Sequence, residues 1–244
     1  MRLALVQVKK WSEDRRVVDL LSTISADVVL LPENWRKGVA REEELFKFFS
    51  SLPDFELLVP GAFYVASGGE TRSRAYVLRR GRVVDYCEKL FPSFAVGEAA
   101  SVRPGNKLCA QRLGWAYVGV LICVDIVFPE LARLYAVRGV NVLLNPANIT
   151  ADRIPLWRSI ILARAFENHA YVAFANNVGG LYADGRPVLG GSAAASPNGH
   201  IIAEGGDMEG VVYASLNEEE VEYARRRRRY LEYLSSFNSS SVQL

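Results

Sequence analysis

The sequence predicts an α/β protein with mixed β-sheets, and two kinds of pattern along its 244 residues indicate this class. Short apolar runs rich in β-branched residues alternate with longer segments in which apolar residues recur at helical spacing. The runs 74–79 and 82–87 are separated only by Arg80 and Gly81, which favours a hairpin and therefore an antiparallel pair of strands. No linker interrupts the pattern, so we expect a single domain over residues 1–234.

The expected elements follow one another in a regular order along the chain. Apolar runs of strand length lie at 2–8, 27–31, 57–64, 74–79, 82–87, 117–122, 140–145, 171–176, 192–195, 200–203 and 210–216. Helical spacing of apolar residues fits 15–25, 41–50, 129–138, 155–168 and 218–234. The third helix begins with Pro129, whose missing N–H costs nothing in a first turn. Arg164 and Glu167 of the fourth helix have the spacing of a structural ion pair.

Composition and charge agree with a compact soluble enzyme. Half of the residues are hydrophobic and the net charge is +2, so we expect neither nucleic acid nor a membrane as a partner. The cations Arg225 to Arg229 follow a run of glutamates in the last helix, which favours a solvated, ion-paired helix over a phosphate-binding one. The Ser-rich tail 235–244 is expected to be mobile or exchanged between subunits of a homodimer or higher homo-oligomer.

The cysteines indicate a reducing, cytoplasmic setting. Cys87, Cys109 and Cys123 are odd in number and lack the spacing of a disulfide framework or a metal site, so we expect no metal and no cofactor. Lys9 and Lys10 interrupt any signal-like apolar core near the N-terminus. Scarce Gln and Met beside plentiful Arg and Glu suggest a thermophilic source.

Three predicted strands end in polar residues whose chemistry is complementary. These residues are Glu33, Lys89 and Cys123. Because the carboxyl ends of strands form the edge at which sites assemble in an α/β sheet, we expect the three side chains to lie together. A carboxylate can take a thiol proton, and a fixed cation can stabilise a thiolate and then an oxyanion. A buried cysteine, a helix-start glutamate or a loop lysine is ordinary alone, and only the combination favours a catalytic site.

The turn that contains Cys123 adds to this interpretation. A helix N-terminus directs free N–H groups toward the thiol, an environment expected to favour the thiolate. Asp125 is expected to brace this turn. The two histidines, His169 and His200, do not lie at the carboxyl ends of predicted strands, so a Cys–His pair is less favoured.

Three segments carry the candidate residues, namely Leu31-Pro32-Glu33, Glu88-Lys89-Leu90-Phe91-Pro92, and Leu121-Ile122-Cys123-Val124-Asp125 followed by Phe128-Pro129-Glu130. They resemble the signature motifs of the nitrilase superfamily of carbon–nitrogen hydrolases. Similar blocks continue in the family's order at Leu5-Val6-Gln7, Arg164-Ala165-Phe166-Glu167-Asn168, Ala175-Asn176-Asn177, Gly190-Gly191-Ser192 and Pro197-Asn198-Gly199. Val124 stands where the family usually has an aromatic residue, and Glu88 where a basic residue commonly precedes the lysine. Both departures concern substrate preference more than chemistry.

The resemblance implies a four-layer α-β-β-α sandwich with two mixed sheets. It also implies hydrolysis of a small amide or carbamoyl substrate, or a nitrile, through a thioester on Cys123. Glu33 would be the base, and Lys89 with the backbone N–H of Val124 would hold the oxyanion. Glu98, in the loop after Lys89, matches a second glutamate of the family that hydrogen-bonds the lysine.

Substrate identity is the least determined property of the sequence. We expect Asn148 and Arg153 as polar anchors, and Tyr64, Phe94 and Trp157 as an apolar wall. A catalytically silent binding protein with the same fold, and an N-acyltransferase that uses the same thioester, are the alternative functions.

Overall fold

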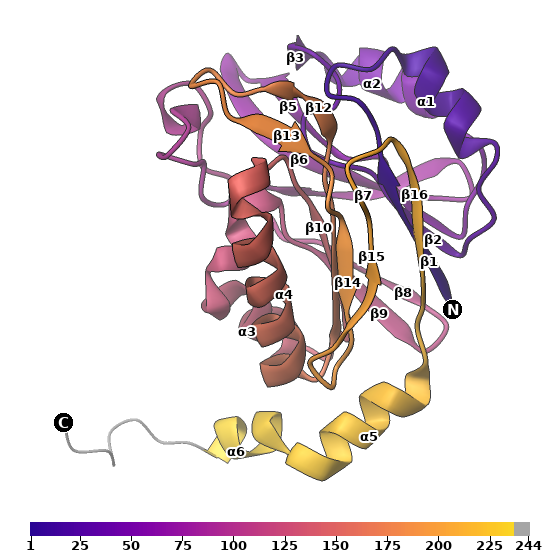
Figure 1. The fold of residues 1–244 in the computed structure, drawn as a ribbon, viewed down its shortest axis with the longest axis vertical. Coiled ribbons are helices and arrows are strands. Elements are labelled where there is room, and N and C mark those ends of the chain that lie inside the picture. Colours follow the sequence, from indigo (N-terminus) through magenta and orange to yellow (C-terminus); the bar gives the residue numbers. More distant parts are fainter. Residues whose placement is uncertain (237–244) are drawn as a thin grey trace.

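The computed structural model describes residues 1–236 and shows two facing β-sheets with helices on their outer sides (Figure 1). The larger sheet contains β1 (Arg2–Gln7), β2 (Val28–Leu30), β3 (Val39–Ala40), β4 (Leu57–Val59), β5 (Ala62–Ser67), β6 (Glu70–Arg79), β7 (Arg82–Glu88) and β16 (Gly210–Ser215). The second sheet contains β8 (Ala110–Leu113), β9 (Ala116–Val120), β10 (Val142–Pro146), β11 (Tyr171–Ala175), β14 (Ala193–Ala195) and β15 (Ile201–Glu204). A separate hairpin is formed by β12 (Val178–Leu181) and β13 (Pro187–Leu189).

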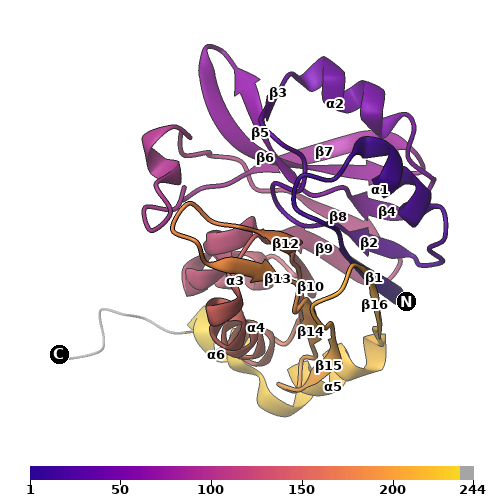
Figure 2. The same ribbon diagram turned by 45° about the horizontal axis from the view of Figure 1, so that its top comes forward.

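Most of the helices cover the two outer faces, and the last ones lie at one end of the molecule (Figure 1). They are α1 (Asp14–Leu21), α2 (Glu42–Phe49), α3 (Pro129–Val137), α4 (Ile154–Asn168), α5 (Glu218–Arg228) and α6 (Tyr230–Ser236), with short 3₁₀ helices η1 (Glu98–Ala100), η2 (Cys123–Val127) and η3 (Ala151–Arg153). Figure 2 shows α1 and α2 beside the larger sheet and α3 and α4 on the opposite side of the molecule. Both sheets contain parallel and antiparallel pairs, so the predicted fold class is confirmed.

Two apolar clusters hold the layers together. One lies between the sheets and joins Leu5 and Leu30 of the larger sheet to Val120 and Leu144 of the smaller one. The other packs α1 and α2 on the larger sheet. Alternate residues of a strand point to opposite faces of the sheet, so β1 contributes side chains to both clusters. For this reason β1 is a nearly continuous apolar run in the sequence.

The predicted strand 57–64 is two strands, and the break positions the site. Gly61 adopts a φ of +109°, and a Cβ at this position would lie 2.3 Å from the carbonyl oxygen of Pro32. Only glycine fits this close approach. The turn brings Ala62 of β5 beside Glu33, where the two residues form an isolated parallel bridge.

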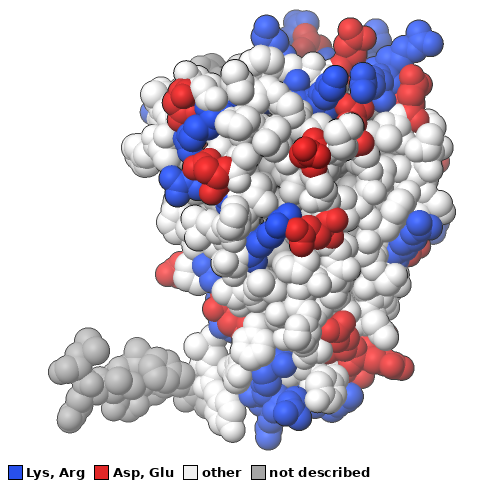
Figure 3. Space-filling model, viewed as in Figure 1, with Lys and Arg blue, Asp and Glu red and all other residues white. Residues whose placement is uncertain are grey.

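The predicted helix 218–234 is also divided, because Arg229 adopts the left-handed conformation between α5 and α6. Figure 3 shows Lys and Arg side chains gathered over this end of the molecule. The arginine run is not simply solvated. Arg226 pairs with Glu222 at 3.1 Å on the exposed side, whereas Arg228 Nη1 donates to Asn198 Oδ1 at 3.0 Å on the body of the protein.

Four short strands were not expected, namely β3, β8, β12 and β13. They are short or polar, so they carry no apolar run for a sequence pattern to detect. Within residues 1–236, none of the helices has the length and apolar content needed to cross a membrane. Of the predicted tail 235–244, residues 237–244 lie outside the described part of the chain.

Candidate active site

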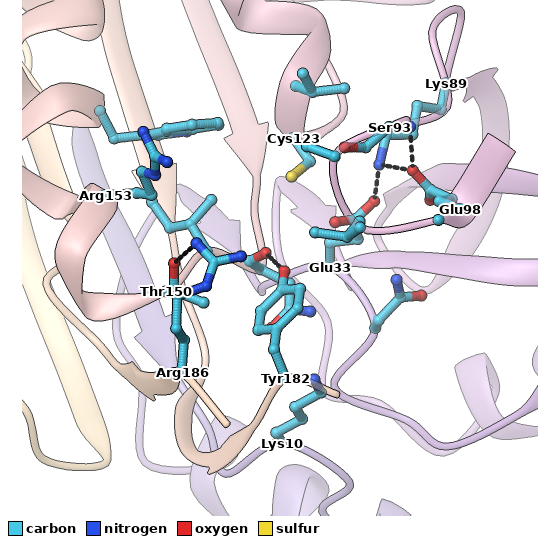
Figure 4. Close-up of a pocket in the computed structure, with 18 of the residues that line it drawn as sticks. Lys10, Glu33, Lys89, Ser93, Glu98, Cys123, Thr150, Arg153, Tyr182 and Arg186 are labelled. Carbon is cyan, nitrogen blue, oxygen red and sulfur yellow. Dashed lines mark hydrogen bonds and ion pairs between the residues drawn. The ribbon is translucent and has the colours of Figure 1, made fainter. Parts of the chain in front are cut away.

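Glu33, Lys89, Glu98 and Cys123 line one cavity of about 870 Å³, a volume suited to a small molecule (Figure 4). Glu33 follows β2 and Lys89 follows β7 in the larger sheet, whereas Cys123 follows β9 in the smaller sheet. The expectation of a single sheet edge was therefore wrong. The site lies where the ends of two facing sheets meet.

Lys89 joins the two carboxylates. Its Nζ lies 2.8 Å from Glu33 Oε1 and 2.7 Å from Glu98 Oε2, and all three side chains are almost completely buried. Burial alone would lower the pKa of Lys89, but the charge on Glu33 leads the effects that raise this pKa well above its ordinary value. An ammonium has three N–H donors, and these two contacts leave one for another acceptor in the cavity.

Glu98 is fixed by two further donors. The Tyr64 hydroxyl donates to Oε1 at 3.0 Å, and the backbone N–H of Ser93 donates to Oε2 at 2.8 Å. These bonds and the Lys89 contact hold both oxygens of the Glu98 carboxylate in place. Glu98 therefore holds the ammonium in place without itself being free to move.

The backbone of Glu33 is anchored to the facing sheet. Its N–H donates to the carbonyl of Ala147 at 3.1 Å, and its carbonyl accepts from Asn177 Nδ2 at 2.6 Å. Burial raises the pKa of the Glu33 carboxyl, while the charge on Lys89 lowers it. A carboxyl whose pKa is raised in this way can accept a proton more readily than an ordinary glutamate.

The turn at Cys123 is held in a conformation that non-glycine residues seldom adopt. Cys123 has a φ of +47° and begins η2. Asn145 Nδ2 donates to the carbonyl of Cys123 at 3.0 Å, and Trp157 Nε1 donates to Asn145 Oδ1 at 3.2 Å. Such strain persists only where surrounding contacts enforce it, and these bonds do so.

Asp125 connects this turn to the lysine segment. Its two carboxylate oxygens accept from the backbone N–H groups of Leu90 and Phe91, each at 3.0 Å. The expected bracing role is therefore extended, because Asp125 fixes Cys123 and Lys89 relative to each other.

The Cys123 thiol is not in a thiolate-favouring environment, which corrects the expectation from the helix N-terminus. Burial and the charge on Glu33 raise its pKa well above the ordinary thiol value. Lys89 and the backbone N–H of Asn148 act in the opposite direction but do not prevail. The thiol therefore holds its proton at rest and needs a base when it reacts.

The other candidate residues divide into two groups. Val124, Asn148, Trp157, Arg153 and Tyr64 line the cavity. Phe94 does not; its side chain is 90% exposed because it lies in the loop before η1. His169 and His200 also lie outside the lining.

Several lining or supporting residues were missed from the sequence. Asn177 lies just after the end of a buried strand, which is the same signal that identified Glu33, whereas Asn145 belongs to the segment Asn145-Pro146-Ala147-Asn148 that was expected to contribute to the pocket. Lys10, Tyr182 and Arg186 carry no such signal, because they reach the cavity from the segment after β1 and from the β12–β13 hairpin. Within residues 1–236, no three or more His, Cys, Asp and Glu side chains are grouped so that they could hold a metal ion.

The fold and the cavity define an α/β enzyme with a thiol, a carboxylate and an ammonium at one site. The chain belongs to the carbon–nitrogen hydrolase family, whose sequence profile matches residues 2–226. The resemblance inferred from the motifs is thereby confirmed.

Known relatives agree with this membership. The chain is 29% identical over 208 residues to the 2-oxoglutaramate amidase of Bacillus subtilis (strain 168), covering 80% of each protein. It is 28% identical over 252 residues to an (R)-stereoselective amidase of a Pseudomonas species, covering 95% of this chain and 90% of that protein. The crystal structure of Nit3 of Saccharomyces cerevisiae, from branch 10 of the nitrilase superfamily, is similar with a TM-score of 0.80. It is 25% identical, and the match covers 93% of this chain and 94% of that one.

Proposed function

We propose that this carbon–nitrogen hydrolase cleaves the C–N bond of a small amide through a thioester on Cys123. The observation that carries the proposal is the shared cavity of Cys123, Glu33 and Lys89, in which the lysine contacts the glutamate at 2.8 Å. The amidase activities named for two relatives support an amide over a nitrile.

The first half of the reaction forms the thioester. Glu33 takes the thiol proton while the Cys123 sulfur attacks the carbonyl carbon of the amide. Negative charge then develops on the carbonyl oxygen, and the remaining N–H of Lys89 Nζ and the backbone N–H of Val124 donate to it. Protonated Glu33 gives the proton to the departing nitrogen as the C–N bond breaks.

The second half releases the acid. A water molecule replaces the departed amine and gives a proton to Glu33 as its oxygen attacks the thioester carbon. The same two donors hold the second oxyanion. Its collapse breaks the C–S bond, and Cys123 recovers a proton from Glu33, so the enzyme returns to its starting state.

The test is a panel of small amides, ureido acids and nitriles, with ammonia and acid measured as products. Cys123→Ala should abolish turnover of every substrate that the wild type accepts. Cys109→Ala is the control, since it also removes a buried thiol but lies outside the cavity lining. Retained turnover in Cys123→Ala, or an N-acyl product instead of a free acid, would contradict the proposal.

A further inference from the structure

One peptide group joins the proposed base to the thiol. The backbone N–H of Glu33 donates to the carbonyl oxygen of Ala147 at 3.1 Å. The N–H of the same peptide group belongs to Asn148 and donates to the Cys123 sulfur, a contact that opposes the effect of burial and of the Glu33 charge on the thiol pKa. Because a peptide group is planar, its C=O and N–H cannot turn independently. The orientation of this peptide therefore fixes the base and a donor to the sulfur together.

Asn177 holds this peptide and Glu33 against each other. Its Nδ2 donates to the carbonyl oxygen of Glu33 at 2.6 Å and to Oδ1 of Asn148 at 3.1 Å. An amide nitrogen has two N–H donors, so these contacts use both. The residue is fully buried, and its backbone carbonyl accepts from the N–H of Gly190 at 2.8 Å. A fixed side chain thus connects Asn148 to the backbone of the base.

The segment around Asn148 is held by further contacts. The Tyr182 hydroxyl donates to the carbonyl oxygen of Asn148 (Figure 4). Asn176 binds both polar backbone atoms of Ile149, since its Oδ1 accepts from the N–H at 2.9 Å and its Nδ2 donates to the carbonyl at 3.1 Å. With its side chain and carbonyl also bonded, Asn148 cannot easily turn its N–H away from the sulfur.

From these contacts we infer that Asn177 is a positioning residue, which holds Glu33 and the Asn148 peptide in one arrangement. In that arrangement, the Asn148 N–H donates to the Cys123 sulfur while the thiol proton passes to Glu33. This inference rests on the thioester chemistry proposed for Cys123. Negative charge develops on the sulfur as the proton leaves, and a donor that is already aimed at the sulfur stabilises this step without reorganisation.

Asn177→Leu tests the inference, because it removes both donors at nearly constant volume. We expect kcat for a small amide to fall by at least about tenfold, since a misplacement of about 1 Å at a reacting group can cost about 10²-fold. KM should change little, because Asn177 does not line the cavity and does not touch the substrate. If Asn177→Leu does not fold, Asn177→Asp keeps the shape, replaces the donors by an acceptor oxygen and should lower kcat in the same way.

Asn168→Leu is the matched control. Like Asn177, Asn168 is fully buried, its Nδ2 donates to two oxygens, and none of the described residues donates to its Oδ1. It lies at the end of α4 and outside the cavity lining, so the folded variant should keep the kcat and KM of the wild type. The folded fraction of each variant is measured by circular dichroism.

Tyr182→Phe examines the Asn148 contact by itself, because it leaves both backbone contacts of Glu33 in place. The Asn148 carbonyl loses its donor and the N–H at the sulfur is held less firmly, so alkylation of Cys123 should require a higher pH. This measurement needs no turnover. If no amide were hydrolysed by the wild type but the alkylation profile moved as expected, the proposed function would be refuted and the arrangement at the sulfur supported. Amide hydrolysis with a wild-type kcat in Asn177→Leu, an equal loss of kcat in Asn168→Leu, or an unchanged alkylation profile in Tyr182→Phe would overturn the inference alone.

Discussion

Cys123 shares its cavity with a carboxylate and an ammonium whose charges act on the thiol in opposite directions. Glu33 raises the thiol pKa and Lys89 lowers it, and burial adds to the effect of Glu33. A thiol that is protonated at rest is protected from adventitious reaction and becomes nucleophilic only when Glu33 takes its proton. At the scale of the residue, the proposed reaction therefore depends on proton transfer from the Cys123 sulfur to Glu33.

Glu33→Gln should separate the two effects of the Glu33 carboxylate, namely its action as a base in turnover and the effect of its negative charge on the pKa of the Cys123 thiol. The amide cannot accept the proton, so kcat should fall by at least about 10²-fold, the lower range for a general base. The thiol pKa should nevertheless fall, because a negative charge that raises it has been removed. Ammonia release gives kcat, and the pH dependence of alkylation of Cys123 gives the pKa. Glu43→Gln on the exposed face of α2 is the control and should match wild type in both measurements.

Lys89→Met should move the thiol pKa in the opposite direction. It removes the only ammonium that contacts Glu33 and Glu98 within the described residues, so the thiol pKa should rise further. Loss of the oxyanion donor should lower kcat by about 10²–10³-fold. Lys89→Arg should not restore it, because a planar fork cannot occupy the position of a point charge between two carboxylates. If both kcat and the thiol pKa of folded Lys89→Met were unchanged, Lys89 would have no part in the reaction.

At the scale of elements, Arg228 is one of the side chains that attach the last helices to the body of the protein, together with Glu220, which accepts from Asn198 Nδ2 at 3.0 Å. Arg228 donates to Asn198 Oδ1 at 3.0 Å and also bonds the Pro197 carbonyl. Its guanidinium lies 4.5 Å from the centre of the Phe166 ring. These contacts connect α5 to α4 and to the turn before β15, although the arginine run looks like a uniformly solvated face in the sequence.

Arg228→Ala should therefore destabilise the protein by about 1–3 kcal/mol, through two lost hydrogen bonds and one cation–π contact. For a chain of this size, that corresponds to a fall in melting temperature of about 2–4 °C per kcal/mol. Arg227→Ala, one residue earlier on an exposed position, should leave the melting temperature nearly unchanged. Equal effects of the two substitutions would show that the docking of Arg228 contributes nothing.

The positions of the site residues relative to the strands also explain which of them could be predicted from the sequence. Glu33, Lys89 and Cys123 end apolar strands, and a polar residue at such an end is a local signal. Glu98 has no local signal, and only the family resemblance singled it out. Phe94 was assigned to the cavity because it is aromatic and close to Lys89 along the chain, but the loop carries it to the surface.

The remaining residues depend on contacts that no local pattern encodes. Lys10 meets Tyr182 only because the segment after β1 pairs with β12, through a bridge between Lys9 and Val178. The thiol pKa was also misjudged, because the helix N-terminus is visible in the sequence whereas burial and the charge on Glu33 are properties of the assembled site.

At the scale of the whole molecule, the two sheets share one apolar cluster, so we expect them to unfold together. Leu144 of β10 lies in this cluster and is fully buried. Leu144→Ala should cost about 2–5 kcal/mol and lower a single cooperative transition without splitting it. Calorimetry checks this expectation. Two separate transitions in the wild type would contradict the single-domain interpretation and would place the site between independently folding halves.

The most direct test of the central claim is to look for the acyl group on Cys123 during turnover. Wild type and Glu33→Gln are each incubated with an amide substrate, quenched in acid and digested. The mass of the peptide that contains Cys123 is then measured by mass spectrometry. We expect an added mass equal to the acyl part of the substrate on Cys123 of the wild type, and no such mass on Cys87 or Cys109. Hydrolysis that proceeds without any adduct on Cys123, and continues in Cys123→Ala, would contradict this claim.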